Sequence, residues 1–328
     1  MTRSHTILLA AVVLITGVFS FTPSAQAAVE TISLIRQDCT GYSTCYTSLS
    51  AWEAARQRDL VAVDQQETAR IEGTWTTPDT TPLSINGWTT DATRFIKIYT
   101  APEARHAGVW DAGRYRLETN GNAIEIYQDY SIIDGLQIRA TSAFSSNGIN
   151  LRGGGIQVRN NILRNSTTGT TDHGILFVNA SSVPNVVSNN VFYDWTTGIR
   201  LSSANAVSPV YNNTIRNSVT GILGHSSRML LLKNNLVSGG TTPFSNLFNA
   251  SSDYNATSGT TATGGANDRV SQAFTFIDAA NNNFHLSSSD TGARDFGATL
   301  SSDPLLAITT DIDGQSRTTP YDIGADET

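Results

Sequence analysis

One pattern, repeated four times across residues 148–240, constrains this chain more than any other feature. Each repeat opens with a glycine, at Gly148, Gly174, Gly198 and Gly221. The spacings of 26, 24 and 23 residues indicate a repeat architecture. Short apolar runs such as Ile149/Leu151 alternate with the period of a strand that has one buried face, and no repeat has room for a helix of ordinary length. Three short strands with turns fit about 23 residues, so each repeat predicts one coil of a parallel β-helix, with neighbouring coils ~4.8 Å apart.

A pair of asparagines recurs with the same period. The pairs are Asn160-Asn161, Asn189-Asn190, Asn212-Asn213 and Asn234-Asn235. A corner between strands often requires a left-handed backbone, which Gly and Asn tolerate best. Stacked Asn side chains can also donate hydrogen bonds to one another and so satisfy buried amide groups. The pairs therefore predict structural corners.

Three features together resemble a known group of proteins. They are the NNxI/NNxL corners, the repeated GIxL strands and the ending DIDGQSRTTPYDIGADE. These are similar to the secreted bacterial right-handed parallel β-helix repeat proteins, including those called choice-of-anchor Q, over most of residues 123–327. The resemblance implies an all-β, single-stranded, right-handed solenoid. It says little about function, because the group contains polysaccharide lyases, hydrolases, epimerases and proteins with no known activity.

The chain divides into four segments. Residues 1–27 predict an export signal, with an apolar core over 7–21 and the small-residue cleavage site Ala25-Gln26-Ala27. Residues 28–60 predict a disulfide loop and a capping helix, residues 61–250 the β-helix coils, and residues 251–328 the final coils and a C-terminal cap. An uncleaved membrane anchor is the weaker alternative, since the apolar run is short for a span. The mature protein is expected to be secreted or at the cell surface, and not membrane-spanning.

Two features predict the N-terminal segment. Cys39 and Cys45 are the only cysteines, and in an exported chain they predict one disulfide. The run from Ser50 to Glu53 has the pattern of a capping box and predicts a helix to about Arg58. This helix would cover the open end of the solenoid, with Trp52 facing the core.

The charge balance limits the partners. The chain carries 21 Lys+Arg and 28 Asp+Glu residues, a net charge of −7. An acidic surface argues against nucleic acid, which requires concentrated positive charge, and mildly against a polyanionic substrate. A polysaccharide is the partner that we favour on other grounds, and the sequence does not indicate the oligomeric state.

Stacked coils place equivalent positions side by side, which predicts an outward row of polar side chains. Tyr193 should lie between Arg164 and Arg216, with Asp194 and Trp195 beside it. The arginines could bind a carboxylate or sulfate, and a lyase needs a base, for which Tyr193 qualifies by type. The alternative is a solvated row in which an arginine pairs with Asp194.

A second row contains Arg159, Ser188, Tyr211 and Lys233, and Lys233 also qualifies by type as a base or a substrate-binding cation. Stacking Trp195 on a sugar ring is a further binding hypothesis. No lyase motif surrounds any of these residues.

Asp172 and His173 end a loop that is five residues longer than its counterparts, which is where a solenoid usually places function. Asp172 and Asp194 would be about one coil apart, and a gap of roughly 8 Å lies within the range of inverting glycosidases. The motifs of polygalacturonase-type hydrolases are missing, however. Catalysis therefore stays open between lyase and hydrolase chemistry.

No cofactor is required by the sequence, and no metal ligands are assigned. Four acidic residues near the C-terminus leave calcium open, alongside turn formation and pairing with Arg317: Asp311, Asp313, Asp322 and Asp326. Two functions remain. The chain could bind, and cleave, an extracellular polysaccharide along one face, or it could be a non-catalytic surface or matrix protein that uses the solenoid as a scaffold.

Overall fold

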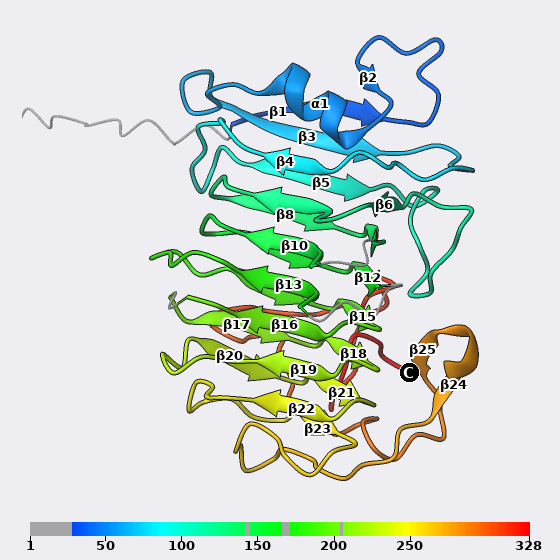
Figure 1. The fold of residues 1–328 in the computed structure, drawn as a ribbon, viewed down its shortest axis with the longest axis vertical. Helices are drawn as coiled ribbons and strands as arrows, with labels where there is room; N and C mark the ends of the chain where they lie inside the picture. The colour runs from blue at the N-terminus through cyan, green and yellow to red at the C-terminus, as the bar shows by residue number, and fades with distance from the viewer. Residues whose placement is uncertain (1–27, 142–144, 166–170, 204–205) are drawn as a thin grey trace, which may run out of the picture.

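The computed structural model describes residues 28–141, 145–165, 171–203 and 206–328 as a right-handed parallel β-helix (Figure 1). The predicted export signal, residues 1–27, lies outside the described residues. Successive coils stack along the long axis, and each regular coil contributes one short strand to each of three parallel sheets. The predicted fold class is confirmed.

The three sheets are named I, II and III in the order in which a coil visits them. Sheet I contains β2 (Cys45–Tyr46), β1 (Val29–Ile35), β3 (Gln65–Ile71), β5 (Ile96–Thr100), β8 (Ser131–Asp134), β11 (Gln157–Arg159), β14 (Val186–Ser188), β17 (Ser208–Tyr211) and β20 (Leu230–Lys233). Sheet II contains β6 (Leu117–Thr119), β9 (Gln137–Ala140), β12 (Ile162–Asn165), β15 (Val191–Tyr193), β18 (Thr214–Arg216), β21 (Leu236–Ser238) and β23 (Ala256–Thr257). Sheet III contains β4 (Leu83–Ile85), β7 (Ile124–Ile126), β10 (Asn147–Leu151), β13 (His173–Phe177), β16 (Thr197–Leu201), β19 (Thr220–Leu223) and β22 (Thr242–Ser245).

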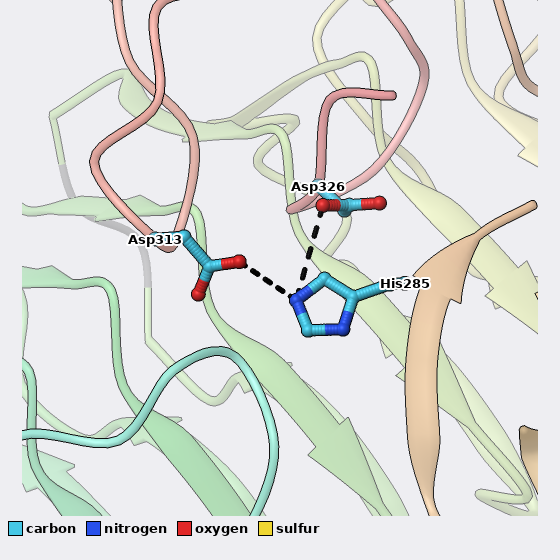
Figure 2. Close-up of side chains that lie close together, drawn as sticks. All are labelled: His285, Asp313 and Asp326. Carbon is cyan, nitrogen blue, oxygen red and sulfur yellow. Dashed lines mark hydrogen bonds and ion pairs between the residues drawn. The ribbon is translucent and has the colours of Figure 1, made fainter. Parts of the chain in front are cut away.

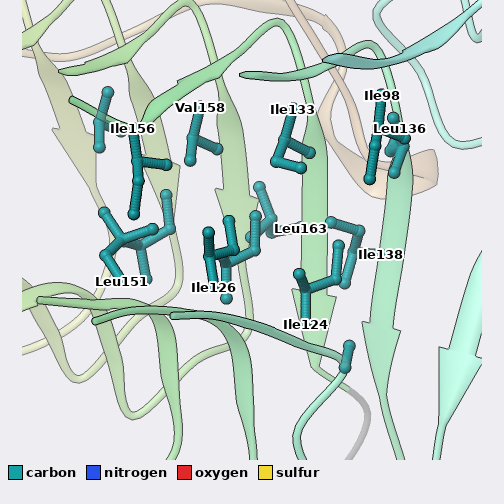
Figure 3. Close-up of a cluster of buried hydrophobic side chains, with 14 of the residues drawn as sticks. Ile98, Ile124, Ile126, Ile133, Leu136, Ile138, Leu151, Ile156, Val158 and Leu163 are labelled. Carbon is teal, nitrogen blue, oxygen red and sulfur yellow. The ribbon is translucent and has the colours of Figure 1, made fainter. Parts of the chain in front are cut away.

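The register of the coils follows the sequence repeat. Ile149 pairs with Ile175, which pairs with Ile199, which pairs with Ile222. The inward residues of all three sheets meet in one continuous apolar core, part of which is shown in Figure 3. Burial of these alternate positions, at roughly 25 cal/mol per Å² of apolar surface, is the main stabilising contribution.

The repeat glycines are required by close packing inside the solenoid. A Cβ on Gly174 would lie 2.6 Å from the carbonyl oxygen of Gly198 and 2.6 Å from Cδ1 of Phe192. Gly148 and Gly198 meet the carbonyl of the following coil in the same way. The glycine therefore recurs because any side chain there would push neighbouring coils apart.

The two asparagines of each corner have different roles. The first has a left-handed backbone, with φ of 55° at Asn160 and 54° at Asn189. The second is buried and donates from Nδ2 to the amide oxygen of the next coil, as Asn161 does to Asn190 at 3.0 Å and Asn190 to Asn213 at 3.0 Å. This Asn ladder satisfies polar groups that cannot reach water.

The N-terminal end of the solenoid is covered by helix α1 (Leu49–Arg56). Its N-cap is Ser48, whose hydroxyl accepts from the N–H of Ala51, so the N-cap lies two residues before the predicted Ser50. Trp52 is fully buried against the core. Cys39 and Cys45 form a disulfide just before the helix. Strand β1 also adds a coil strand within the segment expected to hold only the disulfide loop and the helix.

The C-terminal segment differs from the expected final coils. After β23 the chain forms an antiparallel hairpin of β24 (Phe276–Asp278) and β25 (Asn283–Leu286), joined by the 3₁₀ turn η1 (Ala279–Asn281). Residues 298–328, here called the C-terminal strap, then run back along the flank of the solenoid, and the C-terminus lies beside β18 and β21 (Figure 1).

The strap binds the corners between sheets I and II. The outward amide of Asn234 exchanges hydrogen bonds with Ala298, and Asn189 donates to the carbonyl of Thr310 at 2.9 Å. The left-handed asparagines thus form a row of hydrogen-bonding groups on which the strap docks.

Candidate functional site

The predicted row on sheet II is present but covered. Tyr193 pairs with Arg164 on one side and Arg216 on the other. The β24–β25 hairpin packs over this row: the ring of Tyr193 lies 5.4 Å from that of Phe284, and Tyr193 is 2% exposed. Burial raises the pKa of Tyr193 to about 12, which is the opposite of what a base requires.

The two arginines of this row also pack against aromatic rings. The guanidinium of Arg164 lies 3.8 Å from the ring centroid of Trp110, and that of Arg216 lies 5.0 Å from Phe276. Such cation–π contacts stabilise the cover rather than bind a ligand. The expected exposed pair of cations therefore lies within a packed interface.

Asp172 and Asp194, the pair expected for a hydrolase, lie in different environments. Asp172 is fully buried, and its carboxylate accepts from Ser146 N and Asn165 Nδ2, both at 2.8 Å. Asp194 is exposed at a left-handed corner, and partial burial raises its pKa. Most of the inserted loop, residues 166–170, lies outside the described residues.

Three further candidates have structural partners. His173 is buried with Nε2 3.1 Å from Arg200 Nη1, and burial together with that charge lowers its pKa to about 4. Trp195 is 1% exposed and donates from Nε1 to the carbonyl of Leu163. Lys233 pairs with Asp303 of the strap at 2.6 Å.

Two adjoining cavities follow the outer face of sheet I. The larger, of about 360 Å³, lies between β11, β14 and strap residues 306–310. The smaller, of about 290 Å³, is lined by Phe95, Tyr130 and neighbouring residues. Gln157 and Arg159 line both cavities, which therefore adjoin; the two together are here called the sheet I groove. Arg159 and Ser188 belong to the second row predicted from the sequence; the strap wall has no repeat that could predict it.

Among the residues that line the groove, Arg159 and Asp134 balance one another, and Asp134 also binds Arg105 beside the groove. Asp134 accepts from Arg159 Nε at 2.9 Å and from Arg105 Nη1 at 3.1 Å. Burial alone would raise the pKa of Asp134, but the two arginines and a hydrogen bond from Asn160 lower it below its usual value. Asp134 is therefore ionised, and it acts as an acceptor and not as an acid.

A second cluster lies where the strap meets the hairpin. His285 on β25, Asp313 and Asp326 place one ligand atom each within 4.8 Å of one another (Figure 2). His285 Nε2 lies 2.7 Å from Asp313 Oδ2 and 4.0 Å from Asp326 Oδ1. The bond to Asp313 raises the pKa of His285, and burial raises that of Asp326 to about 7.

The four acidic residues considered for calcium do not form one cluster. Asp311 accepts from the N–H groups of Asp313 and Gln315, which forms a turn. Asp322 accepts from the N–H groups of Asp295 and Thr328. Only Asp313 and Asp326 converge, and they do so around His285.

A third cavity, of about 570 Å³, lies between residues 266–269 and residues 295–299. Of its two acidic residues, Asp268 and Asp295, Asp268 accepts four hydrogen bonds from the surrounding loop, at Thr263 N and Oγ1, Gly264 N and Gly265 N. The guanidinium of Arg269 stacks 3.4 Å from the ring of Phe296. These side chains hold the loop together, and we assign no function to this cavity.

The fold defines a class: a parallel β-helix solenoid protein. Residues 113–288 match the family model described as periplasmic copper-binding protein (NosD), and the chain belongs to this family. That description agrees with the expected export. No curated protein matches the chain. Among the residues that the structure describes, no helix is long and apolar enough to span a membrane.

Proposed function

We propose that the protein binds a linear, uncharged polysaccharide in the sheet I groove and does not cleave it. The observation that carries this proposal is the continuity of the groove. Its lining comes from β8, β11 and β14 and from Phe95, which precedes β5, so it crosses four successive coils. At ~4.8 Å per coil, the groove is about 14 Å long, which suits several units of a chain-like ligand.

The lining suits sugar rings. Phe95 and Tyr130 offer aromatic faces at one end, and Gln157, Arg159 and Ser188 offer donors and acceptors for hydroxyl groups. Apolar faces with a few placed polar groups are typical of small-ligand sites. Because Arg159 is already paired with Asp134, the groove has no free excess of positive charge for a polyanion.

The carboxyl groups that line the groove support binding without cleavage. Hydrolysis requires two carboxyl groups, one of them protonated at working pH. Asp134 is the one carboxylate lining the two cavities, and its pKa is lowered. A non-catalytic binding protein also preserves the alternative of a rigid surface scaffold, since the solenoid would hold the polysaccharide in place.

The test is a panel of neutral and acidic polysaccharides, measured by affinity electrophoresis and by release of reducing ends or unsaturated products. We expect retardation by a neutral polymer and no product. Arg159→Ala should weaken binding about tenfold or more, because it removes a charged hydrogen-bond donor. Arg152→Ala is the matched control, since Arg152 is also half-buried and ion-paired, with Glu125 on the sheet III side. Absence of retardation, or equal loss in both variants, contradicts the proposal.

The family description names copper binding. The ligands present in the described residues indicate whether Cu(I) could be the bound form. Cu(I) prefers thiolate and thioether ligands. Cys39 and Cys45 are joined in a disulfide, and Met229 is the one methionine of the described residues. The described part of the chain therefore offers no cluster of donors for Cu(I).

A further inference from the structure

The geometry points to a binding site for one divalent ion of the Zn²⁺ or Cu²⁺ class at His285, Asp313 and Asp326, which joins the hairpin to the C-terminal strap. We infer this site from the donor set and its support, independently of the sheet I groove. Two of the three ligands lie beyond residue 288, where the match to the family model ends. The site is therefore a feature of this chain's strap.

The orientation of His285 is that of a metal ligand. Its Nδ1 lies 2.6 Å from Asn283 Oδ1, and that same oxygen accepts from the N–H of His285. Because an amide oxygen can only accept, Nδ1 carries a proton, and Nε2 faces the carboxylates. The proton that Nε2 shares with Asp313 Oδ2 leaves when an ion binds. A ligating histidine is usually held by such a bond from its other nitrogen.

The two carboxylates are also held in place and incompletely paired. Asp326 has a side chain that is 9% exposed, and its Oδ2 accepts from Leu286 N at 2.7 Å, which leaves Oδ1 facing His285. Asp313 Oδ1 is buried and has no hydrogen-bond partner. An unpaired buried carboxylate oxygen costs free energy that a cation would offset.

The loop opposite packs closely on the cluster through a glycine. Gly108 has a φ of 67°, and a Cβ there would overlap His285 Nε2 and lie 2.8 Å from Asp313 Oδ1. Gly108 thus lets the loop approach the cluster while leaving the ligand atoms free of a side chain. His106 is anchored away from the cluster, with Nε2 3.0 Å from the carbonyl of Asn160.

The donor chemistry selects the class of ion. Imidazole together with carboxylate suits Zn²⁺ and Cu²⁺, whereas Ca²⁺ and Mg²⁺ take oxygen ligands only. The ligands come from a strand, a turn and the chain end, which are 28 and 13 residues apart in sequence. An ion bound by all three would therefore fasten the strap to the hairpin.

The test uses the full mature chain without an affinity tag, treated with a chelator and dialysed. ZnCl₂ and CuCl₂ are titrated by calorimetry, and Tm is recorded with and without each ion. We expect one ion per chain and a rise in Tm of about 5 °C at a hundredfold excess over Kd. CaCl₂ should give no such rise. The paramagnetic resonance spectrum of the Cu²⁺-loaded protein should show coupling to one imidazole nitrogen.

Asp313→Asn is the informative variant, because it keeps the shape of a side chain whose one hydrogen-bond partner is His285. It should weaken Zn²⁺ binding by about a hundredfold. Asp295→Asn, an exposed acid, is its control. His285→Gln is paired with His225→Gln, because His225 follows β19, outside the cluster, and its ring nitrogen lies 3.1 Å from Ser227 Oγ. Only His285→Gln should abolish the nitrogen coupling. No response of the wild type to Zn²⁺ or Cu²⁺, an equal response to Ca²⁺, or unchanged binding in Asp313→Asn overturns the proposal.

Discussion

The guanidinium of Arg317 and the carboxylate of Glu327 form an ion pair of 3.2 Å within the C-terminal strap, and the arginine side chain has no exposed surface. Arg317 also donates to the carbonyls of Gly324 and Ala325 and to the amide oxygen of Asn189. One side chain therefore folds the end of the strap and joins it to the solenoid corner. The surrounding carbonyl groups satisfy the donors that burial would otherwise leave unpaired.

Arg317→Ala should be among the most destabilising substitutions in the strap. It leaves Glu327 buried without its partner, which costs about 3–5 kcal/mol of unfolding free energy. Chemical denaturation measures the loss, and limited proteolysis should show cleavage in residues 298–328. Arg294→Ala is the control, because its ion pair with Asp295 is exposed and is worth at most about 1 kcal/mol. Equal stability of the two variants would show that the strap does not depend on Arg317.

The Asn ladder gives a second prediction. Asn190 donates to the carbonyls of Val158 and Ser188 and accepts from Asn161. Asn190→Ala should lower the free energy of unfolding by about 3 kcal/mol, because several buried groups lose a hydrogen-bond partner at once. Asn246→Gly should change it by less than about 0.5 kcal/mol, since Asn246 is exposed and its left-handed backbone suits glycine. A small effect at Asn190 would mean that water replaces the amide.

The glycine stack gives a third prediction. Gly174→Ala would place a methyl group 2.6 Å from the Gly198 carbonyl, and we expect a loss of about 1–3 kcal/mol in unfolding free energy. At Gly113 the nearest atom to an added Cβ is Asp111 Oδ1 at 3.2 Å, so Gly113→Ala should cost much less. If the two substitutions have the same effect by denaturation, close packing of coils is not the reason for the repeat.

The sequence predicts the parts of this fold that are periodic. Gly174 and Asn190 recur because each coil repeats the same contacts, and the stacking of Arg164, Tyr193 and Arg216 follows directly from that register. The spacing alone therefore places these side chains in one row. It does not show whether the row is exposed.

That row is covered by the β24–β25 hairpin, a segment that does not follow the sequence repeat. Phe284 lies in an alternating run that is indistinguishable from a coil strand, yet it packs on Tyr193 from outside. The same holds for the metal cluster: His285 and Asp313 are visible in the sequence, but their meeting depends on the path of the strap. Contacts between aperiodic segments are decided by tertiary packing, for which one sequence carries no local signal.

The carboxylate of Glu67 makes the N-terminal cap sensitive to acid. It accepts from Trp52 Nε1 at 3.1 Å, Arg56 Nε at 3.0 Å and Ser33 Oγ at 2.8 Å, all around one buried position. Burial would raise the pKa of Glu67, but these bonds, with Arg56 first among them, lower it below the ordinary 4.5.

Because the folded pKa of Glu67 is lowered, its contribution to stability is fully present above pH 4.5 and is lost as the pH falls below that value toward the folded pKa. Glu67→Gln cannot lose a charge in this window. It should therefore be less stable than the wild type at neutral pH, and the difference should shrink as the medium is acidified. Denaturation at a series of pH values measures both slopes. Glu53→Gln, on helix α1, is the control and should keep the wild-type slope. Parallel curves for the wild type and Glu67→Gln would place the acid sensitivity elsewhere.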